Sequence, residues 1–286
     1  MKFGFPLLCV LISNSLSGQE VEVLKNIPFT DHGPKLDLYL PPEDGSIGLR
    51  PAVLIVHGGG WHGGDKAAAR EKNIGTNLAK AGYVCASINY VLAKKTDLLT
   101  ENLKQVWPRN LNDCMQGVIF LRKNAREYRI DPERIGAIGG SAGGHLVAML
   151  GAVSDGDALD LEGEKFSARV QAVVPMYGVH DLISMAEHRK IETDAETVAL
   201  LKQASPVTHL SKDDPPLLIL HGTRDTLVPR AQSKALHEAA EKAGIESELH
   251  IIKGAKHSFH FEPPQKDLKP LVVKFFDKHL KGKSGR

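Results

Sequence analysis

Apolar residues occur along this chain in short continuous runs, and these runs alternate with stretches in which apolar residues recur at helical spacing. A continuously apolar run is typical of a strand that is covered on both faces, as in a parallel sheet. Because strands and helices alternate, the pattern predicts an α/β fold with a mostly parallel central sheet and helices on both faces. Predicted strands are residues 21–29, 36–40, 52–56, 83–89, 135–138, 170–177, 216–220 and 248–252. Predicted helices are residues 67–81, 112–126, 231–243 and 269–280, with a further helical face that begins near Leu146.

Two stretches interrupt this alternation. Residues 91–109 are longer and more polar than an ordinary connection, and long loops in compact domains often have a function. We interpret this stretch either as part of the rim of a binding site or as a solvated surface loop. Residues 182–204 are rich in charge and predict one or two short helices that form a small cap insert.

The first residues have the pattern of a secretion signal. Lys2 gives a weakly positive start, an apolar run too short to span a bilayer follows it, and residues 15–17 offer small side chains for cleavage. We therefore expect residues 1–18 to be a signal peptide, residues 19–286 to form a single domain, and the protein to be secreted or periplasmic. A buried N-terminal strand is the alternative, and lipidation at Cys9 is less favoured because the residues just before it are not small.

Composition narrows the function classes only slightly. The 286 residues are 42% hydrophobic and 24% charged, as in an ordinary globular protein, and the formal net charge of +2 gives no reason to expect a nucleic-acid partner. Cys85 and Cys114 are expected to be buried thiols, with a disulfide as the alternative in an oxidising compartment. His57 and His62 lack the spacing of metal ligands, and the sequence has no phosphate-binding loop or dinucleotide fingerprint. We therefore expect neither a metal nor a cofactor.

One glycine-rich stretch carries the candidate chemistry. Residues 139–143 fit the pattern G-x-S-x-G, with an apolar strand before them and an apolar helical face after them. Strand, sharp turn and helix form the context of a nucleophile elbow, in which small neighbours allow the serine a strained backbone conformation. Ser141 is therefore the candidate nucleophile, and the helix N-terminus behind it favours developing negative charge. The alternative is a glycine-rich turn that carries an incidental serine.

A second run of glycines follows the predicted strand at residues 52–56. Consecutive glycines at the exit of a buried strand let the backbone turn its N–H groups inward, as an oxyanion hole requires. We expect the amides of Gly59, Gly60 and Ala142 to form that hole. A plain loop at the strand exit is the alternative.

Two later strands end in residues that complete a catalytic set. A serine hydroxyl is a poor nucleophile unless an imidazole accepts its proton, and the imidazole needs a carboxylate on its other nitrogen. Asp225 and His257 each follow a strand, and the carboxyl ends of parallel strands meet at one edge of the sheet. The chain order serine, aspartate, histidine is also that of enzymes with a nucleophile elbow. The sequence therefore predicts a triad of Ser141, His257 and Asp225.

Other residues compete for the roles of base and carboxylate. His260 lies close to His257, which we prefer because it directly follows the turn at residues 254–255. Asp181 also follows a strand, but it is placed to cap a helix of the insert. Three further histidines are expected to have structural roles: His57, His145 and His221.

Together these stretches resemble an α/β-hydrolase from residue 21 to residue 280. The motifs that carry the resemblance are residues 57–61 with 64–66, 139–144, 205–208 and 221–225. The chain is similar to secreted carboxylesterases related to hormone-sensitive lipase, and among them to bacterial feruloyl and acetylxylan esterases. The resemblance implies a serine esterase without a cofactor, and it supports the same triad and the same three amides by position. One departure is Gly140, where relatives often carry Asp or His, so the surroundings of the nucleophile differ.

We therefore predict an exported serine carboxylesterase that removes short acyl or feruloyl groups from small esters or acylated polysaccharide. Trp61 and His62 are expected to line the acyl or sugar pocket, although Trp61 could instead be a packing residue. A serine peptidase similar to the catalytic domain of prolyl oligopeptidases is the first alternative, but 286 residues leave no room for the additional propeller domain. A non-catalytic binding protein on the same fold is the second, and it is disfavoured because all three triad residues are present. The sequence indicates no oligomeric state.

Overall fold

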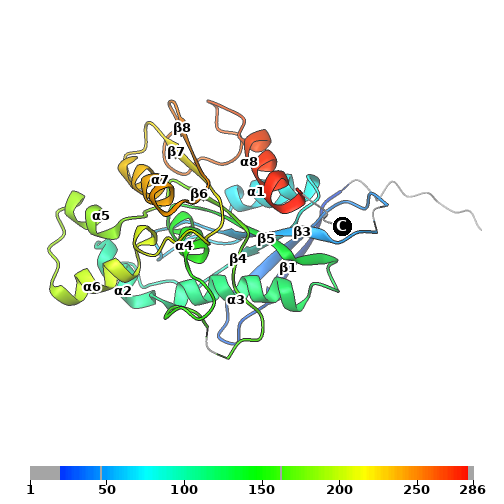
Figure 1. Ribbon diagram of the computed structural model, residues 1–286, viewed down its shortest axis with the longest axis horizontal. Helices are drawn as coiled ribbons and strands as arrows, with labels where there is room; N and C mark the ends of the chain where they lie inside the picture. The colour runs from blue at the N-terminus through cyan, green and yellow to red at the C-terminus, as the bar shows by residue number, and fades with distance from the viewer. Residues whose placement is uncertain (1–19, 46, 162, 283–286) are drawn as a thin grey trace, which may run out of the picture.

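The computed structural model describes residues 20–45, 47–161 and 163–282 (Figure 1). The predicted signal peptide at residues 1–18, and Cys9 within it, lie outside the described residues. From residue 20 onward the chain folds around one eight-stranded sheet. The assignment of residues 19–286 to a single domain stays a prediction.

The sheet has the order β1-β2-β4-β3-β5-β6-β7-β8. Pairing is antiparallel between β1 and β2 and between β2 and β4, whereas every pair from β4 to β8 is parallel. The predicted α/β-hydrolase fold with a mostly parallel sheet is therefore confirmed. The strands are β1 (Glu22–Pro28), β2 (Lys35–Leu40), β3 (Arg50–Val56), β4 (Val84–Ile88), β5 (Ile130–Gly140), β6 (Ala172–Met176), β7 (Leu217–Gly222) and β8 (Ser247–Ile252).

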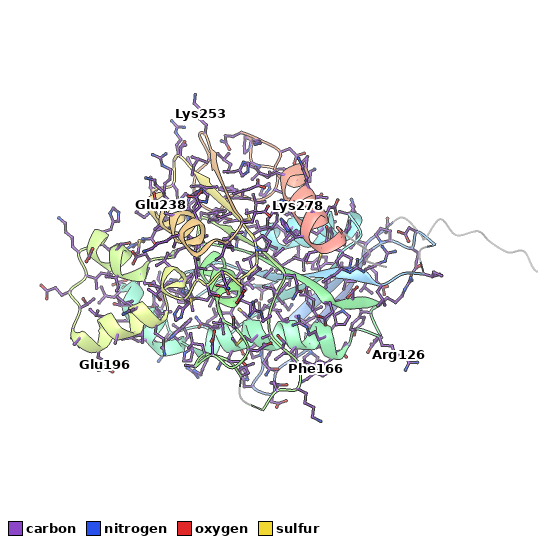
Figure 2. All side chains as sticks on the ribbon, in the orientation of Figure 1. Arg126, Phe166, Glu196, Glu238, Lys253 and Lys278 are labelled. Carbon is purple, nitrogen blue, oxygen red and sulfur yellow. The ribbon has the colours of Figure 1, made fainter. Side chains whose placement is uncertain are left out.

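Helices cover both faces of the sheet (Figure 1). The bounds are α1 (Ala69–Lys80), α2 (Leu99–Val106), α3 (Arg109–Lys123), α4 (Ala142–Ala152), α5 (Leu182–His188), α6 (Ala195–Gln203), α7 (Ala231–Ala243) and α8 (Lys269–Phe276), with short helical turns η2 (Pro206–Thr208) and η3 (Asp277–Lys281). Among the described residues, no helix is both long enough and apolar enough to cross a bilayer. Charged side chains such as Glu196, Glu238 and Lys253 instead project outward from the ribbon (Figure 2).

The side chains of strand β3 pack against the helical layers on both faces of the sheet. Because successive side chains of a strand point to opposite faces, Val53 and Ile55 pack under α1 and α8, whereas Leu54 and Val56 pack toward α3, α4 and α7. All four side chains are fully buried. Burying an aliphatic side chain of this kind contributes about 1.5–3 kcal/mol, so the alternation fixes the central strands in the core.

Two elements differ from the predicted pattern. Strand β5 begins at Ile130 rather than at residue 135, because its pairing with β3 shifts register between Arg50 and Ala52 and accommodates Pro132. The stretch at residues 91–109, predicted as a loop, contains the helix α2. The cap insert has the predicted form of two short helices, α5 and α6.

Both cysteines in the described part of the chain carry free, buried thiols. Cys85 lies in β4 and Cys114 in α3, so neither is bonded to the other. Burial raises the pKa of the Cys114 thiol well above its usual value, which keeps the group protonated and unreactive. The expectation of buried thiols is therefore confirmed, and the alternative of a disulfide between them is wrong.

Candidate active site

Ser141 lies at the sharp junction between β5 and α4. Its backbone is held at φ 57° and ψ −120°, a conformation that costs an ordinary residue about 1–3 kcal/mol. The amide of Ser141 donates to the carbonyl of Met176 at 2.9 Å, which ties the turn to the neighbouring strand β6. A Cβ atom on Gly143 would come within 2.1 Å of the Val56 carbonyl oxygen, so the turn packs too closely against β3 for a larger residue.

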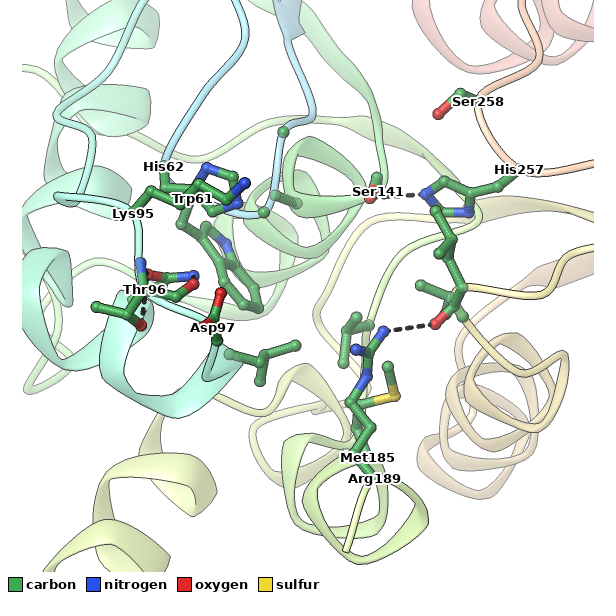
Figure 3. Close-up of a pocket in the computed structure, with 18 of the residues that line it drawn as sticks. Trp61, His62, Lys95, Thr96, Asp97, Ser141, Met185, Arg189, His257 and Ser258 are labelled. Carbon is green, nitrogen blue, oxygen red and sulfur yellow. Dashed lines mark hydrogen bonds between the residues drawn. The ribbon is translucent and has the colours of Figure 1, made fainter. Parts of the chain in front are cut away.

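The three residues predicted as a triad form one hydrogen-bonded line. Figure 3 shows the part of it that joins Ser141 to His257. His257 Nε2 lies 2.9 Å from Ser141 Oγ, and His257 Nδ1 lies 2.6 Å from Asp225 Oδ2. The three side chains come from the ends of β5, β7 and β8, which are 84 and 32 residues apart in sequence yet meet at one edge of the sheet. This arrangement can move a proton from the serine to the imidazole while the carboxylate holds the ring.

The carboxylate of Asp225 is buried and receives four donors. Its Oδ1 accepts the backbone amides of Leu227 and Val228, each at 2.9 Å, and its Oδ2 faces His257. His221 Nε2 approaches the same Oδ2 at 3.2 Å. Burial alone would raise the pKa of the Asp225 carboxyl, but the hydrogen bonds from His221, His257 and Val228 outweigh it and hold that pKa well below its usual value. Asp225 is therefore an anion at neutral pH.

The competing residues have other partners. Asp181 Oδ1 accepts the amide of Ser184 at 3.0 Å and so caps α5, the role that the sequence indicated. His260 Nδ1 accepts the amide of Glu262 at 3.1 Å within its own turn. Neither residue lines the cavity above Ser141.

His145 and Trp61 form a buried pair beneath the cavity. His145 Nε2 donates to the Ala204 carbonyl at 2.7 Å, and its Nδ1 accepts the indole N–H of Trp61 at 3.3 Å. Burial lowers the pKa of His145 to about 4, so the ring is neutral at physiological pH. Trp61 is only 1% exposed, and its ring meets this histidine edge-on with the ring centroids 5.2 Å apart. Trp61 is thus a packing residue that also lines the cavity, and His62, which is partly exposed, lines it as well.

The glycine run after β3 has the geometry that its sequence suggested. Gly59 and Gly60 have φ values of +123° and +60°, in the region that favours glycine, and both line the cavity beside Ser141 and Ala142. Among the described residues, no protein acceptor binds the amides of Gly59, Gly60 or Ala142. These N–H groups are therefore free to bind an oxygen that becomes negatively charged.

A buried ion pair anchors this loop to the sheet. Lys66 Nζ lies 2.7 Å from Asp37 Oδ1, and their side chains are 6% and 3% exposed. The backbone of Lys66 also donates to Asn89 Oδ1 at 2.7 Å and accepts the Ser87 hydroxyl at 2.8 Å. The loop is thus fixed before any substrate arrives, as preorganised donors require.

A cavity of about 610 Å³ opens above Ser141 and His257. Its rim comes from both stretches that interrupted the strand–helix alternation: residues 95–102 on one side, and Met185 and Arg189 of the cap insert on the other (Figure 3). The interpretation of residues 91–109 as part of a rim is therefore confirmed. The lining is mixed, and its apolar residues are Trp61, Leu99, Ala142, Val179, Met185, Leu227 and Val228.

Several lining residues had no recognisable signal in the sequence. Arg70 comes from α1, and Met185 and Arg189 come from the cap. Arg189 donates to the Leu227 carbonyl at 2.9 Å and so joins the cap to the loop that carries Asp225. None of these residues belongs to a motif, because each reaches the site only through the packing of its helix.

In the described part of the chain, no group of three or more histidine, cysteine, aspartate or glutamate residues is placed to hold a metal ion. His145 and His221 are instead bound to neighbouring protein groups.

The sheet order, the strained serine and the hydrogen-bonded line to His257 define an α/β-hydrolase with a serine nucleophile. A family model described as BD-FAE matches residues 36–240, which is most of the chain, and the chain belongs to that family.

Relatives of known name are esterases. The chain is 31% identical over 237 residues to the probable carboxylic ester hydrolase LipM of Mycobacterium tuberculosis, covering 77% of this chain and 52% of LipM. It is also 31% identical over 248 residues to the esterase LipQ of the same organism, covering 82% of this chain and 56% of LipQ. The chain thus spans about half the length of the curated relatives it matches.

Solved structures resemble the chain over nearly its whole length. A truncated carbohydrate esterase from gut microbiota is 27% identical, with a TM-score of 0.74, and the alignment covers 91% of this chain and 97% of that one. The propionate-bound esterase 2 of Thermogutta terrifontis is 26% identical, with a TM-score of 0.70, covering 94% and 97%. The predicted resemblance to serine esterases of the hormone-sensitive-lipase type is therefore confirmed.

Proposed function

We propose that this protein is a serine carboxylesterase that hydrolyses short-acyl esters of alcohols or acylated carbohydrates. The observation that carries the proposal is the line from Ser141 Oγ through His257 to Asp225, with separations of 2.9 and 2.6 Å, at the base of an open cavity. The relatives described as esterases support the reaction class. The carbohydrate esterase from gut microbiota supports a sugar as the alcohol.

In the first half-reaction, Ser141 Oγ attacks the ester carbonyl carbon while His257 Nε2 takes the hydroxyl proton. The imidazolium that forms is stabilised by Asp225, which the amides of Leu227 and Val228 keep in place. His257 then gives the proton to the departing alcohol, which leaves an acyl group on the serine. Water repeats the sequence in the second half-reaction and releases the acid.

The amides of Gly59, Gly60 and Ala142 would bind the carbonyl oxygen as it becomes an oxyanion. Their value lies in being fixed beforehand, since removing one such donor typically costs about 10² to 10³ in rate. The buried pair of Lys66 and Asp37 supports this fixed position from behind the loop.

The size and lining of the cavity support a short acyl group. Its volume of about 610 Å³ is within the range of about 300–1,000 Å³ for small-molecule sites, and it must hold both the acyl and the alcohol parts. Apolar side chains such as Val179, Met185 and Val228 suit a small alkyl group. A feruloyl group is the larger alternative, and it should be tested beside the short acyl groups.

The test is hydrolysis of acetyl, butyryl and feruloyl esters by the purified protein, with Ser141→Ala as the matched variant. Activity that disappears in Ser141→Ala and falls from acetyl to feruloyl would support the proposal. An amide substrate of the same acyl group separates an esterase from a peptidase. Equal rates for the variant and the parent, or hydrolysis of the amide alone, would reject the proposal.

Export of the protein remains part of the proposal, based on the sequence pattern of residues 1–18. N-terminal sequencing of the protein recovered from the periplasm or medium of an expressing bacterium tests it. A mature chain that begins near Gln19 would support export, and an intact N-terminus in the cytoplasm would reject it.

A further inference from the structure

A hydrogen-bonded chain that is separate from the triad reaches the loop carrying His257. Arg70 Nη1 of α1 donates to the hydroxyl of Tyr177 at 3.1 Å, and that hydroxyl donates to the carbonyl of Phe259 at 2.6 Å. The three residues are 107 and 82 positions apart in sequence. Helix α1, the exit of β6 and the histidine loop are therefore joined through one phenol group.

Tyr177 also contacts the catalytic histidine directly. Its ring meets the imidazole of His257 edge-on, with ring centroids 4.9 Å apart, and meets the ring of Phe259 at 4.5 Å. The backbone of Tyr177 is held at φ +40°, a conformation that a bulky residue adopts only when its surroundings impose it. Its amide donates to the Leu220 carbonyl at 2.7 Å and fixes the other end of the residue. Tyr177 is thus a rigid support for one side of the imidazole.

The position next to the nucleophile has to be empty for this support to exist. A Cβ atom on Gly140 would lie 2.6 Å from the Tyr177 hydroxyl oxygen and 2.9 Å from Arg70 Nη1. Both distances are shorter than side-chain carbons tolerate, so any larger residue would displace the phenol or the guanidinium. A side chain at position 140 and the pair of Arg70 and Tyr177 therefore exclude one another.

Arg70 lines the cavity but has few donors to spare for a substrate. Its side chain is 15% exposed, and its Nε donates to Glu71 Oε1 at 2.8 Å. Glu71 is buried and also receives Nη2, so the charge of the guanidinium is already neutralised within the protein. The remaining nitrogen, Nη1, donates to Tyr177.

We propose that Arg70 is a positioning residue: through Tyr177 it holds the loop and ring of His257 in line with Ser141, in the space that Gly140 leaves free. This inference rests on the proposed esterase function. Misplacing a catalytic group by about 1 Å can cost on the order of 10²-fold in rate even when substrate binding is intact. Loss of the pair should therefore appear in kcat and leave KM nearly unchanged.

The experiment measures kcat and KM for an acetyl ester with Arg70→Gln, Tyr177→Phe and the double variant. Arg126→Gln is the matched control, because Arg126 is exposed and its side chain points away from the molecule at the end of α3 (Figure 2). Melting temperatures verify that each variant is folded at the assay temperature. If Arg70→Gln does not fold, Tyr177→Phe and Gly140→Ala make the same comparison without removing a charge.

We expect kcat to fall by about ten- to a hundredfold in each single variant, and the double variant to be no slower than the slower single one. The reason is that either change breaks the same line from Arg70 to the Phe259 carbonyl. Gly140→Ala should show the same loss, because its methyl group meets both partners.

Three results would overturn the inference. Unchanged kcat in both single variants would show that the histidine loop does not need this support. A raised KM with normal kcat in Arg70→Gln would make Arg70 a substrate contact instead. Effects that multiply in the double variant would show two independent roles. If the parent protein hydrolyses no ester at all, the proposed function fails first, which is a distinct result.

Discussion

Replacing Asp225 by asparagine is the sharpest single test of the site, because the two side chains have the same shape. The carboxylate accepts the amides of Leu227 and Val228 on Oδ1, at 2.9 Å each, and faces His257 Nδ1 with Oδ2 at 2.6 Å. An asparagine keeps the two backbone donors only if its oxygen replaces Oδ1. Its NH2 group must then point at the imidazole.

This orientation inverts the protonation of the imidazole. The NH2 group donates to His257 Nδ1, so the ring proton moves to Nε2, which lies 2.9 Å from Ser141 Oγ. An Nε2 that carries a proton cannot accept the proton of the serine. The carboxylate that would stabilise the imidazolium is lost in the same change. We expect kcat to fall by about 10⁴-fold, which is roughly 5 kcal/mol of transition-state stabilisation, with KM nearly unchanged.

The assay compares kcat and KM for an acetyl ester in Asp225→Asn and Asp181→Asn. Asp181 is the matched control, since it also follows a strand but only caps α5 through the amide of Ser184. Asparagine caps a helix about as well as aspartate, so the control should stay within a few-fold of the parent. An Asp225→Asn enzyme within tenfold of the parent would refute the reasoning, as would a 10³-fold loss in the Asp181→Asn control.

Two further predictions concern stability. The neutral, buried ring of His145 has a pKa of about 4 in the folded protein and about 6.5 in the unfolded chain, so the unfolded state binds more protons between these values. Stability should therefore decrease as the pH falls from about 6.5 to 4, by on the order of 3 kcal/mol from this group, and urea unfolding of His145→Gln should show a weaker pH dependence over that range. Lys66→Met leaves the buried carboxylate of Asp37 without its partner and should lower the free energy of unfolding by about 3–5 kcal/mol, whereas the double variant with Asp37→Leu should lose less. Equal pH slopes for parent and His145→Gln, or equal losses in the single and double Lys66 variants, would contradict these expectations.

The central part of the fold was predictable because its strands are buried on both faces. Residues 52–56 are continuously apolar, and all five side chains are buried in β3. Such a run can be satisfied only between two layers of helices, so the sequence pattern and the packing describe the same constraint. The glycines around Ser141 were equally informative, since the close approach of Gly143 to β3 excludes larger residues.

Helix α2 was missed because it has only eight residues and buries polar side chains beside Leu103 and Val106. Asn102 and Thr100 are buried in it, and the Asn102 amide group bonds the backbone and hydroxyl of Thr96 in the preceding loop. Buried polar residues reduce the apolar periodicity that identifies a helix in a sequence. The rim was therefore predicted as a stretch that could be functional, whereas its internal structure could not be predicted.

The catalytic residues could be predicted from the sequence, whereas the residues that position His257 could not. Ser141, Asp225 and His257 follow strands in recognisable motifs, because the chemistry requires these residue types at strand ends. Arg70 and Tyr177 reach the site from a helix surface and a strand exit, and their partners are set only by the packing of α1 on the sheet. No pattern local to either residue indicates this role.

At Gly140 the structure explains a feature that the sequence comparison left without a reason. The resemblance to secreted carboxylesterases marked it as a departure from the side chains that relatives often carry beside the nucleophile, and it offered no reason for the change. The structure gives a steric reason, because the Tyr177 hydroxyl oxygen lies 2.6 Å from where a side chain at this position would begin. A missing side chain next to a nucleophile is thus informative when a residue distant in sequence fills its space. Relatives with Asp or His at this position should therefore support their catalytic histidine by other contacts, and a residue other than tyrosine at the position of Tyr177 is the change to expect with them.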